Sequence, residues 1–285
     1  MQCVVCGTDR WPRIFNRLQT DFVRCATCGL IRMEFLPSQE EIQQHYSRKA
    51  ICGNYELLQR YDLEYEIVYR QFLNLILRYS GDPRGLQLFD IGCFTGRFLD
   101  KAQEAGFITY GVEYQTEAAR IANERHDGRV YCGSIENYSP LPDPQFAIVT
   151  AFGVIEHVTA PDMMVKLAAG QLKQGGLFVI QTPNTASFPA SILGKYWPPY
   201  TPVEHIHYFS SQNIKILLGR YGFSVIRTIN HWKKLPVGYV YNQFQNFGPE
   251  FRQIFSKIMP FLPHSVLDWK LPFYVGEMIV IAQKT

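Results

Sequence analysis

A glycine-bounded loop that follows a short apolar run constrains the fold more than any other feature of this chain. The segment LQLFDIGCFTGRFL covers residues 86–99, with Asp90 near the end of the apolar run and with Gly92 and Gly96 bounding the loop. A strand, a tight glycine loop and a helix in this order form the first crossover of a nucleotide-type α/β fold, whose ligand lies at the carboxyl end of the strand. The segment therefore predicts a parallel sheet with a ligand site at residues 90–96.

The details of the loop indicate which ligand it takes. A dinucleotide fingerprint needs a middle glycine so that the backbone can approach a pyrophosphate, and here residues 93–95 are Cys-Phe-Thr. Asp90 would repel a phosphate and attract a cation such as an amino group. The next predicted strand, 107–113, ends in Glu113, about 20 residues after Gly92, as ribose-diol recognition requires. This pattern favours S-adenosylmethionine over NAD or ATP.

Length and charge limit the classes of protein to which the chain can belong. Its 285 residues are enough for one large α/β domain and a small module, and 47% of them are hydrophobic. The net charge of +3 gives no argument for a nucleic-acid partner. No apolar run approaches the ~18 residues of a membrane span, and no signal-peptide core is visible. We therefore expect a cytoplasmic protein with no membrane span and no nucleic-acid partner.

Two Cys-x-x-Cys pairs near the N-terminus predict a structural zinc site. Four of the seven cysteines form them, Cys3 with Cys6 and Cys25 with Cys28. Each pair lets two thiolates face one tetrahedral ion, and four thiolates close its coordination shell, so the metal should stabilise and not catalyse. Two disulfides are the alternative, which a reducing cytosol disfavours.

Periodicity divides the chain into a zinc ribbon (1–30), a helical linker (31–83) that packs on the main domain, and an α/β domain (84–285). Helical spacing of apolar residues predicts a helix over 55–79. Strands are predicted near 86–91, 107–113, 129–132, 145–151, 176–182, 223–230 and 276–283, with helices centred on 96–105, 115–125, 161–172 and 211–221. This alternation predicts a Rossmann-like, mostly parallel seven-stranded sheet with helices on both faces, and the last two strands could form an antiparallel edge.

Two long connections follow late strands and are predicted to act as lid segments. They are 185–208, which carries the sequence EHIH at 204–207, and 233–274, which is rich in aromatic residues. Apolar residues recur at helical spacing over 251–259, which indicates core or lid packing, or alternatively a subunit or membrane contact. We expect both segments to cover an acceptor pocket, and the second could also form a homodimer contact.

Taken together, these motifs resemble a known family. The chain is similar to class I S-adenosylmethionine-dependent methyltransferases, in the group that includes the ubiquinone-pathway O-methyltransferases, and most resembles bacterial members with an N-terminal zinc ribbon. The matching stretches run in family order: CATCGL (25–30), FDIGC (89–93), GVE (111–113), VIEHV (154–158), LKQGG (172–176), TPN (182–184), EHIHYF (204–209) and YGF (221–223).

The resemblance implies roles for individual cofactor-binding residues. It implies that Asp90 holds the methionine amino group and that Glu113 grips both ribose hydroxyls. Backbone at Gly92 and Cys93 would line the methionine part. Adenine would lie along Tyr114, with its edge read by Ser134 and Ile135, while Ala151 and Phe152 would flank the sulfonium. An aromatic face for this cation could come from Phe152 or Tyr55.

Histidines are the candidates for removing a proton from the acceptor. His157 follows the fourth predicted strand beside the expected sulfonium, and His205 lies on the late connection. His157 could instead only brace its loop, and an acidic acceptor would need no base. The ubiquinone-pathway enzymes resemble Glu-x-x-Glu-His at a proposed metal site, where this chain has Gly153 at the first Glu, which puts a catalytic metal in doubt.

The leading hypothesis from the sequence is methylation of a small-molecule acceptor. The expected reaction is O-methylation of a sugar, lipid-linked or secondary-metabolite hydroxyl. One alternative is a noncatalytic zinc-ribbon protein that keeps S-adenosylmethionine as a structural ligand. Another is nucleic-acid methylation, against which the missing basic stripe argues.

Overall fold

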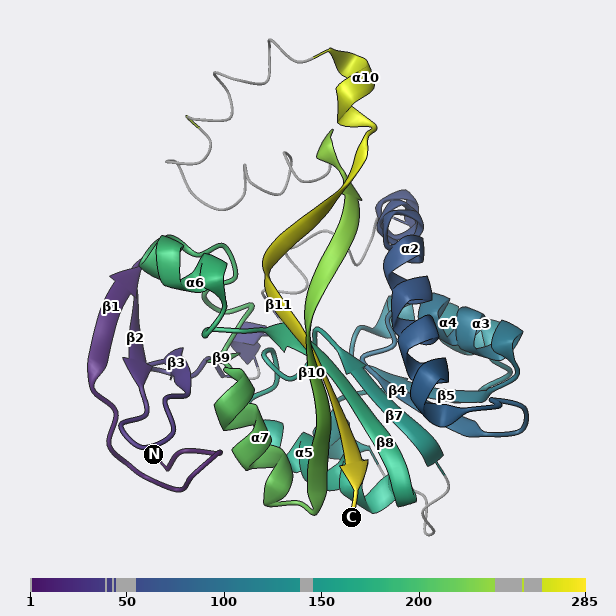
Figure 1. Cartoon of the computed structure of the whole chain (residues 1–285), viewed down its shortest axis with the longest axis horizontal. Helices are drawn as coiled ribbons and strands as arrows, with labels where there is room; N and C mark the ends of the chain where they lie inside the picture. Colours follow the sequence, from purple (N-terminus) through teal and green to yellow (C-terminus); the bar gives the residue numbers. More distant parts are fainter. Residues whose placement is uncertain are drawn as a thin grey trace.

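The α/β domain is built on one seven-stranded sheet. The computed structural model describes residues 2–38, 40–42, 44, 55–138, 146–238, 253 and 263–285, without the side chains of 55–64, 136 and 264. The strand order is β10-β11-β8-β7-β4-β5-β6 (Figure 1). The strands are β4 (Gln87–Ile91), β5 (Ile108–Glu113), β6 (Val130–Cys132), β7 (Phe146–Phe152), β8 (Leu172–Pro183), β10 (Phe223–Pro236) and β11 (Lys270–Lys284). All seven predicted strands are confirmed.

The direction of the strands also follows the prediction, with one refinement. The pairs β4–β5, β4–β7, β5–β6 and β7–β8 are parallel. β11 is antiparallel to both of its neighbours and is inserted between β8 and the edge strand β10. The expected antiparallel strand is therefore β11, the second strand from the edge of the sheet, and β10 forms the edge itself.

Helices cover both faces of this sheet because each strand alternates its side chains between them. On one face Phe89 of β4 joins a core with α5 (Pro161–Gln171) and α7 (Ser211–Gly219). On the other, the adjacent Leu88 joins a core with α2 (Tyr55–Ser80), α3 (Arg97–Ala105) and α4 (Thr116–Arg125). Figure 1 shows these two helical layers on opposite sides of the sheet. The predicted fold class is thus confirmed, including the long helix near 55–79.

The N-terminal module is a second, smaller sheet. β1 (Arg13–Arg17), β2 (Thr20–Arg24) and β3 (Ile31–Met33) form an antiparallel meander, so this sheet continues past residue 30. Its fourth strand is β9 (His207–Tyr208), which belongs to the late connection. In Figure 1 the module lies beside α6 (Phe188–Leu193) and to the left of α7. We call residues 3–33 the ribbon from here on.

The two long connections are partly ordered into elements. The first contains α6, the short 3-10 helix η3 (Gly194–Tyr196) and β9. The second begins with the last residues of β10 and ends with the first residues of β11, and these two strands pair with each other. It also includes α10 (His264–Leu267). Most of the segment 251–259 lies outside the described residues. In the part of the chain that the structure covers, no helix is both long and apolar enough to cross a membrane.

Candidate active site

A cavity of about 320 Å³ opens at the carboxyl ends of the parallel strands. This is the place where open α/β sheets bind their ligands. Its walls come from Ile42 and from loops that follow β4, β5, β6 and β7. The lining residues are Ile42, Ile91, Gly92, Phe94, Val112, Glu113, Tyr114, Gln115, Gly133, Ser134, Ile135, Phe152, Gly153, Val154, His157, Val158 and Thr159.

The conformation of the loop after β4 favours glycine at two positions, of which Gly92 lines the cavity. Gly92 has φ +75°, and a Cβ there would lie 2.5 Å from the Cγ2 atom of Val154. Gly96 caps α3 with φ +82°, and its Cβ would lie 2.9 Å from the His126 ring. Both conformations are costly for residues with a side chain. A side chain at Gly92 would thus press on Val154 of the cavity wall, and one at Gly96 would press on His126 behind the loop.

Glu113 is fixed in position at the end of β5. Its two carboxylate oxygens accept hydrogen bonds of 2.8 Å from the backbone amides of Phe94 and Gln115. Burial raises its pKa above the ordinary value, although these amides favour the charged form. The side chain lines the cavity. A carboxylate held by two amides at this edge is well placed to accept hydrogen bonds from a diol.

Asp90 lies below the loop and not among the lining residues. It is 3% exposed, and its Oδ1 atom accepts a hydrogen bond of 2.6 Å from the hydroxyl of Thr150 on β7. Burial raises the pKa of Asp90 to about 7, and the negative charge of Glu113 adds to the rise. A buried acid of this kind gains when a cation comes near it. Sequence reasoning found Asp90 and missed Thr150.

The other predicted cofactor residues divide between the cavity wall and the layer behind it. Five line the cavity: Gly92, Tyr114, Ser134, Ile135 and Phe152. Cys93 and Ala151 are buried behind the wall. Tyr55 begins α2, and its side chain lies outside the described residues.

The ring of Phe152 is held in a cluster of aromatic side chains. It stacks on Phe72 of α2 with ring centroids 4.0 Å apart and meets Phe98 of α3 edge to face at 5.0 Å. Helices from one sheet face thereby fix an aromatic ring in the cavity wall.

His157, His205 and Glu156 come together beside the cavity. The rings of the two histidines meet edge to face with centroids 4.7 Å apart, and Nε2 of His157 lies 4.0 Å from Oε1 of Glu156. One ligand atom from each of the three residues lies within 4.8 Å of the others. Two imidazoles and a carboxylate can move protons or hold a divalent cation. The structure thus brings His205 of the late connection next to Glu156 and His157, which follow closely after Gly153, the position where the resembling enzymes have an acid.

Backbone contacts decide how these histidines are held. Nδ1 of His205 lies 2.7 Å from the carbonyl oxygen of Pro199, to which it donates. Nε2 is then the acceptor nitrogen of the neutral ring. His207, two residues later, is buried against the Val158 carbonyl, and burial lowers its pKa to about 4. Glu156 is buried, which raises its pKa to about 8, and its Oε2 atom has no hydrogen-bond partner among the described residues.

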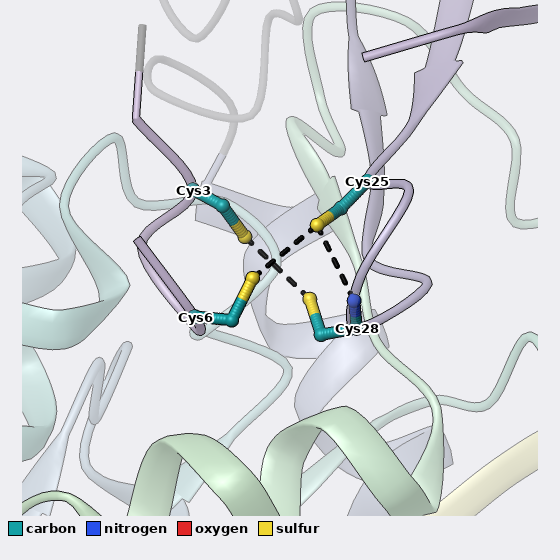
Figure 2. A group of neighbouring side chains, drawn as sticks. All are labelled: Cys3, Cys6, Cys25 and Cys28. Carbon is teal, nitrogen blue, oxygen red and sulfur yellow. Dashed lines mark hydrogen bonds between the residues drawn. The ribbon is translucent and has the colours of Figure 1, made fainter. Parts of the chain in front are cut away.

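The four predicted metal ligands of the ribbon also come together (Figure 2). Sγ of Cys3 lies 3.5 Å from Sγ of Cys28, and Sγ of Cys6 lies 3.4 Å from Sγ of Cys25. Thiolates around tetrahedral zinc, with bonds of ~2.3 Å, lie about 3.8 Å apart. The four cysteines therefore fit a zinc ion with little adjustment, and they form a closed shell.

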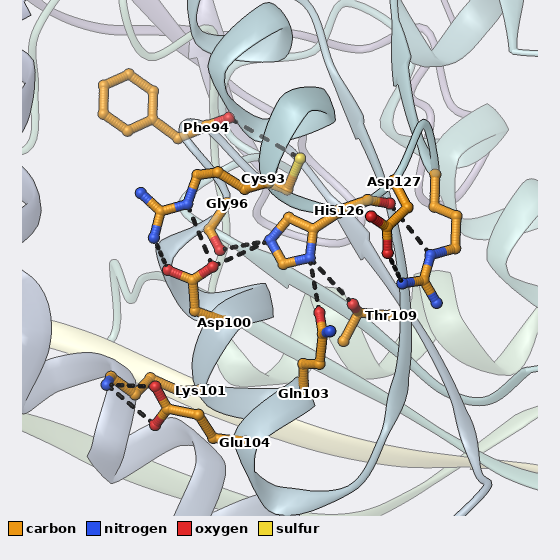
Figure 3. A network of polar contacts seen from close by, with 12 residues as sticks. Cys93, Phe94, Gly96, Asp100, Lys101, Gln103, Glu104, Thr109, His126 and Asp127 are labelled. Carbon is orange, nitrogen blue, oxygen red and sulfur yellow. Dashed lines mark hydrogen bonds and ion pairs between the residues drawn. The ribbon is translucent and has the colours of Figure 1, made fainter.

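Behind the glycine loop lies a polar network that the sequence did not reveal (Figure 3). His126, fully buried, places Nε2 3.1 Å from the carbonyl oxygen of Gly96 and 3.3 Å from the Asp100 carboxylate. Its Nδ1 atom faces Gln103 and Thr109 at 3.1 Å and 3.3 Å. The network ties the loop to α3, α4 and β5. A lone histidine at a helix end carries no sequence signal for this role.

Comparison with known proteins identifies the family of the chain. The model of a methyltransferase domain family matches residues 60–228. Ubiquinone biosynthesis O-methyltransferase from Bradyrhizobium sp. (strain ORS 278) is 35% identical over 117 residues, which cover 39% of this chain and 46% of that one. The same enzyme from Idiomarina loihiensis is 30% identical over 39% and 48%. The chain thus spans about half the length of the curated relatives it matches.

Solved structures share the fold. A SAM-dependent methyltransferase from Archaeoglobus fulgidus has a TM-score of 0.53 and 21% identity, covering 81% of this chain and 100% of that one. The magnesium protoporphyrin IX methyltransferase of Synechocystis, solved with bound SAH, has a TM-score of 0.53 and 13% identity, covering 85% and 100%.

The seven-stranded sheet has the Rossmann-like fold of the class I S-adenosylmethionine-dependent methyltransferases, and the cavity lies where such sheets bind their ligands. Because the family model matches more than half of its residues, this chain belongs to that methyltransferase domain family. The resemblance to the methyltransferases is thereby confirmed, while the zinc ribbon lies outside the matched residues and stays a prediction.

Proposed function

We propose that the chain transfers the methyl group of S-adenosylmethionine to a hydroxyl oxygen of a small-molecule acceptor. The observation that carries the proposal is that one cavity joins the amide-held carboxylate of Glu113 to His157, which the ring of His205 meets. An acid suited to a ribose diol and a base suited to an acceptor proton thus share one space. The acceptor class that we expect is a sugar, lipid-linked or secondary-metabolite hydroxyl.

The residues that surround the cavity suit this cofactor. Glu113 would accept hydrogen bonds from the ribose hydroxyls, and Asp90 would balance the charge of the amino group through its buried carboxylate. Phe152 would offer a ring face to a sulfonium, a contact worth ~0.5–2 kcal/mol. When bound, S-adenosylmethionine supplies an electrophilic methyl group. Zinc at the four cysteines is part of the same proposal, as a structural ion.

The chain's own chemical task would then be to orient the acceptor and to take its proton. His157 lines the cavity and is the first candidate base. His205 is the second, because its Nδ1 is engaged by Pro199 and its Nε2 can accept a proton. Alignment of the nucleophile supplies the remaining effect. We expect the protein to work in the cytoplasm without nucleic acid, and dimer contact through 233–274 stays a prediction.

Calorimetry with S-adenosylhomocysteine tests the cofactor half of this proposal. Glu113→Ala should weaken binding by roughly 10–100-fold, because charge-assisted hydrogen bonds contribute about 1.5–3 kcal/mol. Glu117→Ala is the matched control, since Glu117 is a partly exposed residue of α4 that pairs with Arg120. Unchanged affinity in Glu113→Ala would show that the cofactor binds elsewhere. Tight binding without any methyl transfer would instead support the noncatalytic alternative.

A further inference from the structure

The ribbon and the late connection form one sheet. β9 pairs with β3 in antiparallel register, with Ile31 opposite Tyr208 and Arg32 opposite His207. The amide of Met33 also donates to the carbonyl oxygen of Ile206 at 3.2 Å. A strand from the methyltransferase domain therefore completes the sheet of the N-terminal module, and residues 206–208 are hydrogen-bonded to the ribbon.

The same two segments share a hydrophobic core. Its buried members are Phe22, Ile31 and Met33 from the ribbon and Ala190, Trp197, Tyr200 and Tyr208 from the late connection. Arg17 of β1 adds two hydrogen bonds of 2.7 Å, to the carbonyl oxygens of Lys195 and Trp197. Because both segments contribute side chains to this core, the apolar side chains of each are buried against those of the other.

His205 lies inside this shared structure. Two residues before it, Val203 has φ +71°, a strained conformation that a β-branched residue rarely adopts. The amide of Val203 donates to Sδ of Met33 at 3.3 Å. The hydroxyl of Tyr208 donates to the carbonyl oxygen of His205 at 2.8 Å. The strained turn at Val203 and these two hydrogen bonds fix the position of the His205 backbone, and therefore of its ring.

We infer that the ribbon is a brace that positions His205 beside the cavity, with Met33 and Tyr208 as positioning residues. The cavity itself is lined by residue 42 and by residues 91–159. None of these lining residues belongs to the ribbon, although Cys3, Val5, Cys25, Cys28 and Leu30 of the ribbon share a hydrophobic core with lining residues such as Ile91 and Val112. The inference rests on the proposed function only for what His205 does, and the bracing can be tested without an acceptor.

Hydrogen exchange of the zinc-loaded full chain tests the brace. The amides of Ile206 and His207 donate to the Glu156 carbonyl oxygen at 2.8 Å and 3.1 Å, so their protection reports whether the segment is seated. Met33→Ala should speed exchange in peptides covering 203–209 by about tenfold or more, because it removes core volume and the sulfur acceptor. Peptides covering 92–96 and the affinity for S-adenosylhomocysteine should stay within about twofold of wild type.

A matched pair separates positioning from general packing. Tyr208→Phe deletes the hydroxyl that holds the His205 carbonyl, whereas Tyr200→Phe deletes a hydroxyl from the same aromatic cluster. Nitrogen NMR of the His205 ring should show the Nδ1–H tautomer in wild type and in Tyr200→Phe. That tautomer should be lost or mixed with the other in Tyr208→Phe and Met33→Ala.

The outcomes are distinct. Full protection of 203–209 and an unchanged His205 tautomer in folded Met33→Ala would overturn the brace. Met33→Leu, which keeps the volume but removes the sulfur, serves if the alanine variant does not fold, and the same two readouts apply. If the wild-type protein does not bind S-adenosylhomocysteine, the proposed function is contradicted, whereas the inference that the ribbon positions His205 is unaffected.

Discussion

The imidazole rings of His157 and His205 meet edge to face with centroids 4.7 Å apart, although one follows β7 and the other precedes β9. The buried carboxylate of Glu156 lies beside them, with Oε1 4.0 Å from Nε2 of His157. The backbone carbonyl of Glu156 meanwhile accepts the amides of Ile206 and His207. Side chains and backbone of one short loop therefore contact both histidine-bearing segments, so the two rings can act as a unit.

Replacing either histidine should lower turnover far more than cofactor binding. We expect His157→Ala or His205→Ala to reduce kcat by roughly 10²–10⁴-fold if the residue acts as the base. The double variant should lose little more than the worse single variant, because residues that act as a unit are not additive. A labelled-methyl transfer assay on the natural acceptor measures kcat, with the S-adenosylhomocysteine affinity as control. Normal turnover in both single variants would exclude these histidines from proton transfer.

The buried Asp90 should make cofactor binding depend on pH. Burial raises the pKa of Asp90 to about 7, so below that pH the free protein holds a proton on this carboxylate. A bound ammonium group would displace the proton. S-adenosylhomocysteine affinity should therefore rise about tenfold from pH 6 to pH 8, with proton release on binding. Calorimetry in buffers of different ionisation enthalpy measures both quantities.

The same shift makes a prediction about stability, with the opposite sign. A raised carboxyl pKa contributes stability that is fully present below the unfolded value of ~3.9 and is lost as the pH rises toward about 7. Asp90→Asn should therefore flatten both the stability profile and the binding profile between pH 4 and pH 8. An unchanged binding profile in Asp90→Asn would assign the proton to another group, for which Glu113 is the first candidate, because it lines the cavity and burial raises its pKa as well.

The cofactor half of the site could be predicted from the sequence because local patterns encode it. Glycine spacing, an acid at a strand end and the apolar run of β4 are short-range signals, and they placed Gly92 and Glu113 on the cavity wall. The catalytic half could be foreseen only in part. Histidines could be proposed from their chemistry, yet their meeting at 4.7 Å depends on how a late connection folds back.

Long-range pairing explains what the sequence could not show. Residues 207–208 are two residues of strand, too short for any periodicity, and their partner β3 lies in another module. The insertion of β11 between β8 and β10 likewise depends on which edges meet, and periodicity reports burial but not partners. His126 and Thr150 belong to the same class, since their roles arise only from the contacts they make.

Zinc should be bound at one ion per chain and should be needed for the ribbon and not for the cofactor. Cys25→Ser should abolish metal binding and unfold the ribbon, because structural zinc couples binding to folding with apparent energies of ~10–16 kcal/mol in small fingers. Cys132→Ser is the matched control, since Cys132 is exposed and lies on β6, outside the ribbon. Metal analysis and calorimetry measure the two effects. Zinc-free wild-type protein, freshly prepared under reducing conditions, would contradict the assignment.

Gly92→Ala should abolish cofactor binding because the new side chain clashes with a neighbouring residue, and Gly128→Ala, which causes no such clash, is the matched control. Gly92 and Gly128 have φ of +75° and +77°, so alanine should cost both a similar backbone strain of about 1 kcal/mol. Only at Gly92 does the new Cβ meet another residue, at 2.5 Å from Val154, whereas nothing lies within 4 Å at Gly128. Urea unfolding should therefore show a larger loss of stability for Gly92→Ala. Calorimetry should show loss of S-adenosylhomocysteine binding in that variant alone, and equal binding in both would mean that the loop does not form the cofactor wall.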